Sequence, residues 1–225
     1  MTRRTETATL PAAVLWDMDG TLVDTEPYWI ETEFALAREY GGTWSEELAL
    51  QLVGNDLITS GRFIRKHMGI DLTPEEIVER LLDGVVARVQ TEVPWRPGAR
   101  ELLDRLRETG VPCALVTMSY ERFVAPILDR LPPGSFRVVV TGDAVSRGKP
   151  DPEPYLTAAR LLGVDAGSCV AIEDSDTGAT SAAAAGCPVL VVPNHVDVPP
   201  GPGRTFRASL VGLDLEELGG LADLG

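Results

Sequence analysis

Two aspartates stand two residues apart at the end of a short apolar run, where their carboxylates could do chemistry together. Asp17 and Asp19 follow residues 12–16, whose apolar character predicts a β-strand. Residues i and i+2 of an extended segment point the same way, so the two carboxylates can converge before Gly20 lets the chain turn. Such a pair favours a hard divalent cation such as Mg²⁺, which prefers oxygen ligands. A solvated Asp-Gly turn is the alternative, and the pair alone does not decide.

Three later segments each place a phosphate- or metal-binding group beyond an apolar run. They are residues 113–116 before Thr117, Met118 and Ser119, residues 138–140 before the Gly148-Lys149-Pro150 segment, and residues 170–172 before Glu173, Asp174 and Ser175. In open α/β sheets, ligands bind at the carboxyl ends of strands. We therefore expect the four strand ends to form one polar site.

The residue types at these four ends suit phosphoryl transfer. Asp17 is a candidate nucleophile that would form an aspartyl-phosphate, and Asp19 is a candidate general acid and base. The Thr117 hydroxyl, main-chain N–H groups around Met118 and the Lys149 ammonium could bind the phosphate oxygens. Each residue also has a structural explanation: Thr117 could end a strand and Lys149 could lie exposed in a turn.

The elements that must position these residues alternate between strand and helix patterns over most of the chain. Residues 25–95 differ, because they carry helical periodicity with almost no strand signal, and Thr25 is the predicted N-cap before Pro27. We expect an α/β protein in which residues 1–24 and 96–225 form the core and residues 25–95 form a helical domain. The expected helices span residues 28–40, 45–53, 57–67, 74–90 and 99–109. The later expected strands span residues 111–116, 188–192 and 208–211. Residues 193–204 are expected to form a loop and residues 213–218 an amphipathic end.

Composition indicates a folded, acidic protein. The chain has 225 residues, 44% of them hydrophobic, which is enough for one substantial core and a smaller second unit. Twenty Lys and Arg residues against 34 Asp and Glu residues give a net charge of −14, which disfavours partners such as nucleic acid and anionic membranes. The oligomeric state is left open, with a monomer as the default expectation.

The cysteines and the N-terminal segment bear on the compartment. Cys113, Cys169 and Cys187 lack metal-ligand spacing and lie in or beside apolar runs, which predicts reduced core residues. The first residues include Arg3 and Arg4 but no long apolar segment, and no window approaches the length of a membrane span. We expect a cytoplasmic protein.

Four motifs occur in order along the chain: DMDGTLVDTE, LVTMS, GKPDPEPY and IEDSDTGATSAAAAG. In this order and at these separations they resemble the motifs of the haloacid dehalogenase-like (HAD) hydrolase superfamily, from Val14 to about Val192. The similarity is strongest to the branch that holds β-phosphoglucomutase and small-metabolite phosphatases. It implies a Rossmann-like parallel sheet core with an inserted helical-bundle cap, Mg²⁺ as cofactor and a small phosphorylated metabolite as substrate.

The resemblance also implies a metal site. Asp174 would complete it with an Asp17 oxygen and the main-chain carbonyl of Asp19, while Glu173 would orient a metal-bound water from the outer shell. Glu173 and Asp174 could instead cap the helix that is expected after Ser175.

Departures from subfamily patterns favour hydrolysis. Dehalogenases and the phosphonate-cleaving branch lack the second aspartate, whereas Asp19 is present here. Mutases of this branch usually carry a histidine shortly after the first motif, where this chain has residues 26–29, EPYW. A phosphatase is therefore the favoured hypothesis, with a sugar-phosphate mutase or a non-catalytic phosphometabolite-binding regulator as the alternatives.

The helical segment is expected to supply substrate specificity. The Gly54-Asn55-Asp56 turn falls where related caps lower a loop into the active site, so Asn55 is a candidate substrate contact; an ordinary helix–helix turn is the alternative. A basic cluster could meet a second anionic group or could be a solvated face. It consists of Arg62, Arg65, Lys66 and His67.

Overall fold

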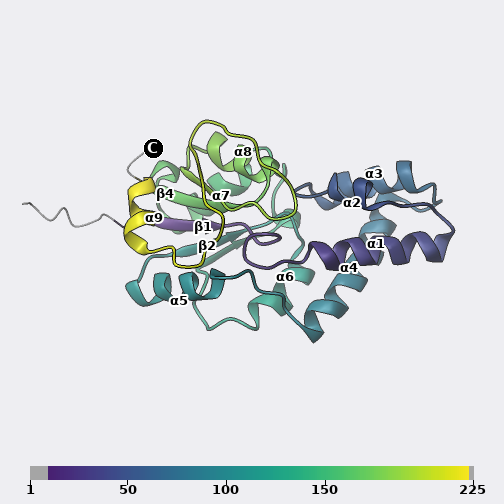
Figure 1. The fold of residues 1–225 in the computed structure, drawn as a ribbon, viewed down its shortest axis with the longest axis horizontal. Helices are drawn as coiled ribbons and strands as arrows, with labels where there is room; N and C mark the ends of the chain where they lie inside the picture. The colour runs from purple at the N-terminus through teal and green to yellow at the C-terminus, as the bar shows by residue number, and fades with distance from the viewer. Residues whose placement is uncertain (1–9, 223–225) are drawn as a thin grey trace, which may run out of the picture.

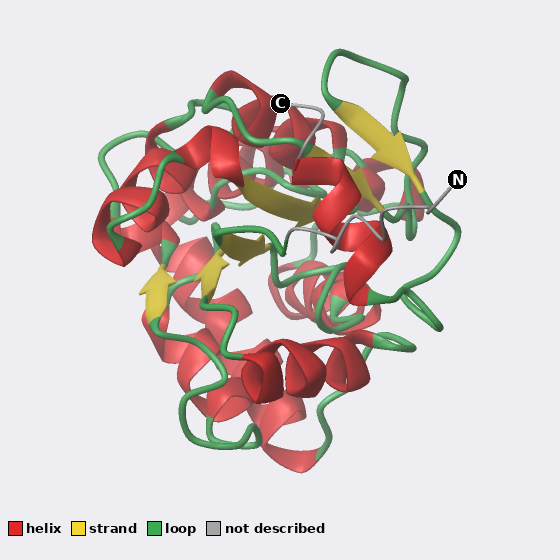
Figure 2. Cartoon of the chain, turned by 90° about the vertical axis from the view of Figure 1, so that its left-hand side faces the viewer, coloured by secondary structure: helices red, strands yellow, loops and turns green. Residues whose placement is uncertain are grey.

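The computed structural model describes residues 10–222 and contains a six-stranded sheet with helices on both faces (Figures 1 and 2). The strand order is β3-β2-β1-β4-β5-β6, and each neighbouring pair is parallel. This confirms the predicted α/β class. The strands are β1 (Ala13–Trp16), β2 (Cys113–Val116), β3 (Val138–Val140), β4 (Cys169–Glu173), β5 (Val189–Val191) and β6 (Arg204–Phe206).

The helices fall into two groups along the chain. The first four follow one another between β1 and β2: α1 (Glu26–Tyr40), α2 (Glu46–Leu50), α3 (Leu57–Met68) and α4 (Pro74–Thr91). They lie together at the right-hand end of Figure 1, whereas α9 lies at the opposite end. The others are α5 (Ala99–Thr109), α6 (Glu121–Leu128), α7 (Glu153–Leu162), α8 (Asp176–Ala184) and α9 (Leu215–Ala222), with 3₁₀ segments at Gly142–Ala144 and Ala166–Ser168.

Strand β1 is buried on both faces because successive side chains alternate across the sheet. Ala13 and Leu15 belong to a hydrophobic cluster that includes residues of α7 and α8. Val14 and Trp16 belong to a second cluster that includes residues of α5, α6 and α9. This second cluster continues into α1, α3 and α4, so the apolar core is shared between the sheet and the helical segment. The predicted division into two domains is not tested by these contacts and stays a prediction.

Two chain segments connect the sheet to the helical segment and lie side by side. Val23 and Trp95 form an antiparallel bridge, the Asp24 N–H donates to the Pro94 carbonyl, and the Arg96 N–H donates to the Leu22 carbonyl. The end of β1 is therefore tied to the segment that returns from α4.

The helix boundaries were largely predictable, but the last strand was not. Helix α5 has the predicted bounds, whereas α2 is shorter than the expected helix at 45–53. The strand predicted at 208–211 is wrong: these residues form turns, and β6 (Arg204–Phe206) lies at and just beyond the end of the predicted loop. Strand β6 is an exposed edge strand, so it lacks the apolar run that marks a buried strand.

The three cysteines are free and buried, as predicted. None of the helices within residues 10–222 combines the length and apolarity needed to cross a bilayer. Arg3 and Arg4 lie outside the described residues, and the cytoplasmic location stays a prediction.

Candidate active site

A cavity opens at the carboxyl ends of β1, β2 and β4 and is closed on its other side by helices α1, α3 and α4. It encloses about 650 Å³, its solvent-filled mouth included. Strands β1 and β4 meet where the strand order changes direction, which is the usual position of a ligand site in such sheets. The lining residues are Asp17, Asp19, Glu26, Trp29, Glu33, Leu52, Gly54, Asn55, Leu57, Ser60, Leu81, Thr117, Met118, Ser119, Lys149, Asp174 and Ser175.

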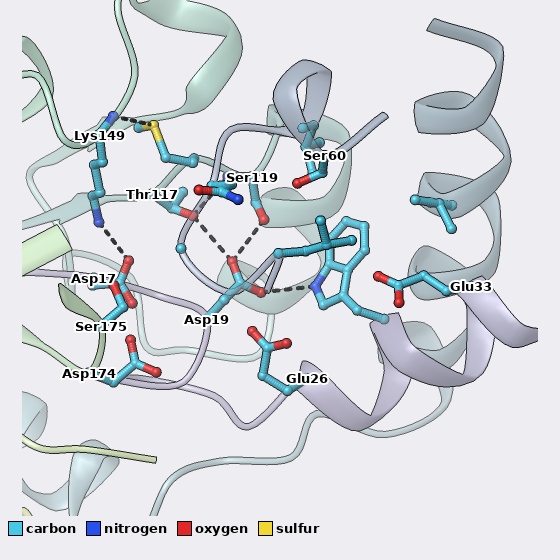
Figure 3. Close-up of a pocket in the computed structure, with 17 residues that line it drawn as sticks. Asp17, Asp19, Glu26, Glu33, Ser60, Thr117, Ser119, Lys149, Asp174 and Ser175 are labelled. Carbon is cyan, nitrogen blue, oxygen red and sulfur yellow. Dashed lines mark hydrogen bonds and ion pairs between the residues drawn. The ribbon is translucent and has the colours of Figure 1, made fainter. Parts of the chain in front are cut away.

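Lys149 is a buried cation held between two carboxylates. Its Nζ lies 2.7 Å from Asp17 Oδ1 and 2.7 Å from Glu173 Oε1, and its side chain is 2% exposed (Figure 3 draws the Asp17 contact). Burial alone would lower the pKa of Lys149, but the charges of Asp17 and Glu173 outweigh burial and raise it. The lysine therefore stays charged and fixes the orientation of the Asp17 carboxylate.

Glu173 lies behind the cavity wall and positions Lys149 from there. Its Oε1 also accepts a hydrogen bond from the Tyr155 hydroxyl at 2.6 Å, and its Oε2 accepts one from the Asp174 N–H at 3.2 Å. The side chain is fully buried. A carboxylate in this setting needs all of these donors, because an unpaired buried charge is costly.

The space for Glu173 depends on Gly178, whose position in α8 has no room for a methyl group. A Cβ at Gly178 would overlap the Glu173 carboxylate, whereas a Cβ at Gly220 in α9 would meet no atom within 4 Å. We expect Gly178→Ala to lower the free energy of unfolding by about 1–3 kcal/mol and to reduce kcat by displacing Lys149. Gly220→Ala should raise stability by up to about 1 kcal/mol. Urea unfolding of both variants tests this, and equal stabilities would contradict it.

Asp19 is held by four donors that come from two segments of the chain. Its Oδ1 accepts from the Thr25 hydroxyl at 2.5 Å and from the Trp29 indole at 3.3 Å. Its Oδ2 accepts from the Ser119 hydroxyl at 2.8 Å and from the Thr117 hydroxyl at 3.3 Å (Figure 3). Thr25 precedes α1 as predicted, but its side chain makes no cap hydrogen bond and binds Asp19 instead.

Three buried carboxylates lie close enough to share a cation. Asp17, Glu173 and Asp174 each offer an oxygen, and these atoms all lie within 4.8 Å of one another. Asp17 Oδ2 and Asp174 Oδ2 are buried and have no hydrogen-bond partner among the described residues. Gly20, with φ +87°, allows the turn after β1 to approach the Asp174 carboxylate, which a Cβ would overlap. Orphaned buried carboxylate oxygens of this kind fit a hard divalent cation.

The protonation of these acids supports the same conclusion. Burial raises the pKa of Asp17 to about 7, and the charge of Glu173 adds to this effect. Burial and the charge of Asp17 also raise the pKa of Asp174. Opposite charge lowers a carboxyl pKa, so a cation beside the two groups would favour their ionised forms at neutral pH.

Helix α1 contributes three side chains to the cavity that sequence reasoning missed. Glu26, Trp29 and Glu33 line it from one face of the helix, at the i, i+3 and i+7 spacing that places residues on the same side. Both carboxyl groups are buried, and burial raises the pKa of Glu26 to about 8. The spacing was readable, but nothing in the sequence showed that this face meets the strand ends.

Glu33 makes the stability of the protein depend on pH. Burial raises its pKa from 4.5 to about 7, against the opposing effect of the hydrogen bond from Trp44 Nε1. Because the folded-state pKa is the higher one, the folded state holds this proton more tightly. The contribution of this proton to the free energy of unfolding is fully present below about pH 4.5 and is lost as the pH rises through about 7.

We therefore expect Glu33→Gln, which cannot ionise and can still accept from Trp44, to be more stable than the wild type at high pH. The gap in the free energy of unfolding should grow by roughly 1–3 kcal/mol between about pH 5 and about pH 9. Glu39→Gln, on the exposed side of the same helix, should show no such growth. Urea unfolding at the two pH values measures both gaps, and parallel pH profiles for the wild type and Glu33→Gln would contradict the expectation.

The structure brings the sequence-predicted residues together. Asp17, Asp19, Thr117, Met118, Lys149, Asp174 and Asn55 all line the cavity. Thr117 does lie at the end of β2, but its hydroxyl also contacts Asp19. Lys149 is buried rather than exposed in a turn. Asn55 does form a helix–helix turn, its Nδ2 donating to the Gln51 carbonyl at 3.2 Å, and it lines the cavity as well.

The basic cluster of α3 lies elsewhere. All four of its side chains are exposed, and none of them lines the cavity. They form a solvated face, and His67 stacks on Phe63 with ring centroids 4.2 Å apart.

Comparison with known proteins gives concordant results. A family model described as haloacid dehalogenase-like hydrolase matches residues 14–192. Hexitol phosphatase A of Escherichia coli (strain K12) is 36% identical over 208 residues, which are 91% of each chain. The phosphorylated carbohydrates phosphatase of Thermotoga maritima is 33% identical and covers 77% of this chain and 81% of its own. The structure is also similar to that of a CbbY mutant from Rhodobacter sphaeroides in complex with xylulose-(1,5)bisphosphate, with TM-score 0.78, 25% identity and coverage of 91% and 96%.

Proposed function

The chain belongs to the haloacid dehalogenase-like hydrolase family and is a phosphoric monoester hydrolase. From this premise we propose that it is a Mg²⁺-dependent phosphatase whose substrates are small phosphorylated carbohydrates. We propose further that the reaction proceeds through an aspartyl-phosphate. The observation that carries this proposal is the convergence of Asp17, Asp19, Lys149 and Asp174 on one cavity. The names of two relatives, hexitol phosphatase A and phosphorylated carbohydrates phosphatase, support the substrate class.

Asp17 is the proposed nucleophile. Lys149 holds one of its oxygens, which fixes the carboxylate at the tip of β1 while the group still lines the cavity. Attack on phosphorus forms a bond from an Asp17 oxygen and releases the alcohol of the substrate. Water then cleaves the acyl phosphate and returns the Asp17 carboxylate.

Asp19 is the proposed general acid and base. In the first step it gives a proton to the departing alkoxide oxygen, and in the second it takes a proton from the attacking water. Its contacts with Thr25, Trp29 and Ser119 support this role, because they hold the carboxylate in one orientation. Positioning of this kind accounts for much of the rate in phosphoryl transfer.

Asp17, Asp174 and the Asp19 main-chain carbonyl would hold Mg²⁺, with Glu173 outside this set as the residue that orients its surroundings. When bound, the ion would neutralise charge on the phosphoryl oxygens. The Thr117 hydroxyl, the Lys149 ammonium and the Met118 N–H would bind the same oxygens. The Met118 N–H makes no hydrogen bond within residues 10–222, so it is open to a ligand.

The helical segment is proposed to act as a cap. We assign residues 25–95 to it and residues 10–24 and 96–222 to the core; the ends of the predicted core, 1–9 and 223–225, lie outside the described residues. The antiparallel bridge between Val23 and Trp95 supports this division, because it marks where the chain leaves the core and where it returns. Asn55 is the proposed substrate contact at the rim of this cap.

A phosphate-release assay tests the proposed function. We expect sugar and polyol monophosphates to be hydrolysed with Mg²⁺ present and turnover to fall to background with excess EDTA, because the buried acids would lose their cation. Readdition of Mg²⁺ should restore activity. A hexose phosphate that isomerises without release of phosphate would indicate a mutase. The absence of phosphate release from all of the sugar and polyol monophosphates would contradict the phosphatase assignment.

A further inference from the structure

The cavity has a second half, on the side of the helical segment, that supplies no reacting group to the proposed mechanism. Helices α1, α3 and α4 and the segment before α3 build its wall, which is mainly apolar. The apolar side chains are Trp29, Leu52, Leu57 and Leu81. Four polar side chains line the cavity from these elements: Glu26, Glu33, Asn55 and Ser60. Of these, Glu33 and Ser60 have no role in the proposed reaction.

Glu33 is a buried carboxyl without a cation. The residue is 3% exposed, and its Oε2 accepts a hydrogen bond from Trp44 Nε1 at 2.9 Å. Its Oε1 has no hydrogen-bond partner, and no lysine, arginine or histidine pairs with Glu33 in the part of the chain that the structure describes. In Figure 3 the carboxyl group is directed into the cavity. An acceptor that is open towards the cavity in this way fits a ligand that donates a hydrogen bond.

Ser60 offers a second polar group to the same space. It is 7% exposed and lines the cavity from α3, while Glu33 lines it from α1 (Figure 3). Within residues 10–222 its hydroxyl makes no hydrogen bond, although Ser60 donates its backbone N–H to the Asp56 carbonyl. A hydroxyl can donate and accept, so Ser60 complements a ligand that also does both.

The charges around the cavity exclude an anion from this half. Lys149 is the only cation among the described residues that line the cavity, and the carboxylates of Asp17 and Glu173 already balance its charge. Glu26 and Glu33 contribute carboxyl groups from α1. A second phosphate or a carboxylate placed here would face Glu33 in its ionised form at a pH above its pKa of about 7, without a basic side chain to pair with, and like charges at close quarters cost several kcal/mol.

We propose that Glu33 and Ser60 bind the hydroxyl groups of an uncharged polyhydroxy chain whose other end carries the phosphate, and that Glu33 rejects substrates with an anionic distal end. This rests on the proposed phosphatase function and specifies its substrate class. Hydroxyl groups donate strong hydrogen bonds to a carboxylate, and the C–H faces of such a chain pack against the apolar wall. Sugars and polyols present both kinds of surface.

A matched pair of substrates tests the proposal. Sorbitol 6-phosphate and 6-phosphogluconate differ at the far carbon, which is a hydroxymethyl group in the first and a carboxylate in the second. At about pH 8, where Glu33 is mostly ionised, we expect kcat/KM to favour sorbitol 6-phosphate by at least about 100-fold. Comparable values for the two substrates would overturn the proposal.

Variants assign the preference to the named residues. Glu33→Gln should reduce the preference by at least about tenfold, mainly by raising kcat/KM for 6-phosphogluconate, because the repulsion is removed. Ser60→Ala should lower kcat/KM for sorbitol 6-phosphate by several-fold and leave the rejection of the carboxylate in place. Glu39→Gln, exposed on α1, is the control and should change neither value. An unchanged preference in Glu33→Gln would overturn the proposal.

Two further substrates separate the possible failures. Glucosamine 6-phosphate hydrolysed more than about tenfold faster than glucose 6-phosphate would show that Glu33 selects a cation, and would overturn the hydroxyl proposal. Wild-type turnover of p-nitrophenyl phosphate, which carries no hydroxyl group, reports on the phosphatase function alone. If that turnover is present and the sorbitol preference is absent, the inference about Glu33 fails while the proposed function stands.

Discussion

Replacing Asp17 with asparagine is expected to abolish turnover, by roughly 10⁴-fold or more in kcat, while the protein remains folded. The amide has the shape of the carboxylate but is not a nucleophile, so no acyl phosphate can form. The fold should survive because the amide oxygen of the new side chain can still accept from Lys149 and because one of three crowded carboxylates is removed. Phosphate release measured over long incubations, together with far-UV circular dichroism, gives both results.

Asp71→Asn is the matched control, since Asp71 is exposed and lies outside the cavity. It should retain the activity of the wild type. An Asp17→Asn variant that keeps a substantial fraction of wild-type turnover would remove the covalent mechanism, because no other residue has been assigned the nucleophilic role.

Replacing Lys149 with methionine is expected to damage stability and activity together. The variant leaves Asp17 and Glu173 buried without their shared cation, and breaking a buried ion pair in this way costs about 3–5 kcal/mol. The loss of a charge that faces the phosphoryl group should lower kcat by about 10²–10³-fold. Urea unfolding in EDTA, where no metal compensates the acids, and phosphate release with Mg²⁺ measure the two effects.

A second substitution separates the structural and catalytic parts of this effect. Glu173→Gln added to Lys149→Met removes one uncompensated charge, so the double variant should be more stable than Lys149→Met alone and remain inactive. The other lysine of the chain, Lys66, is exposed, and Lys66→Met should change neither property. A Lys149→Met variant as stable as the wild type would contradict the assigned role of the ion pairs.

Much of the core of the site was predictable because each motif residue follows a short apolar strand. Asp17 comes directly after β1 and Thr117 directly after β2, while Glu173 ends β4 and Asp174 follows it. Parallel strands bring their carboxyl ends to one edge, so strand prediction alone places these groups together. Burial of both sheet faces also explains why the strands read as apolar runs.

The remaining parts of the site depend on contacts between elements that a single sequence does not encode locally. Thr25 carries the pattern of an N-cap, yet its hydroxyl binds Asp19 because the turn at Gly20 brings the two residues together. Glu33 looks like an ordinary surface glutamate of an amphipathic helix, and its burial depends on the packing of α1 against α4 and on the contact with Trp44. Strand β6 escaped prediction because an edge strand lacks a buried apolar pattern.

The central claim is that the phosphoryl group passes through Asp17, and trapping the phosphoenzyme tests it most directly. The wild type would be mixed rapidly with substrate and Mg²⁺, quenched in acid within the first turnover, digested and mapped by mass spectrometry. The proposed mechanism predicts a peptide carrying one additional phosphoryl group on Asp17, absent from Asp17→Asn. Two results would contradict the mechanism. One is a phosphoryl group found on another residue while hydrolysis proceeds at full rate. The other is the absence of any phosphoenzyme at every quench time although burst kinetics show that an intermediate forms.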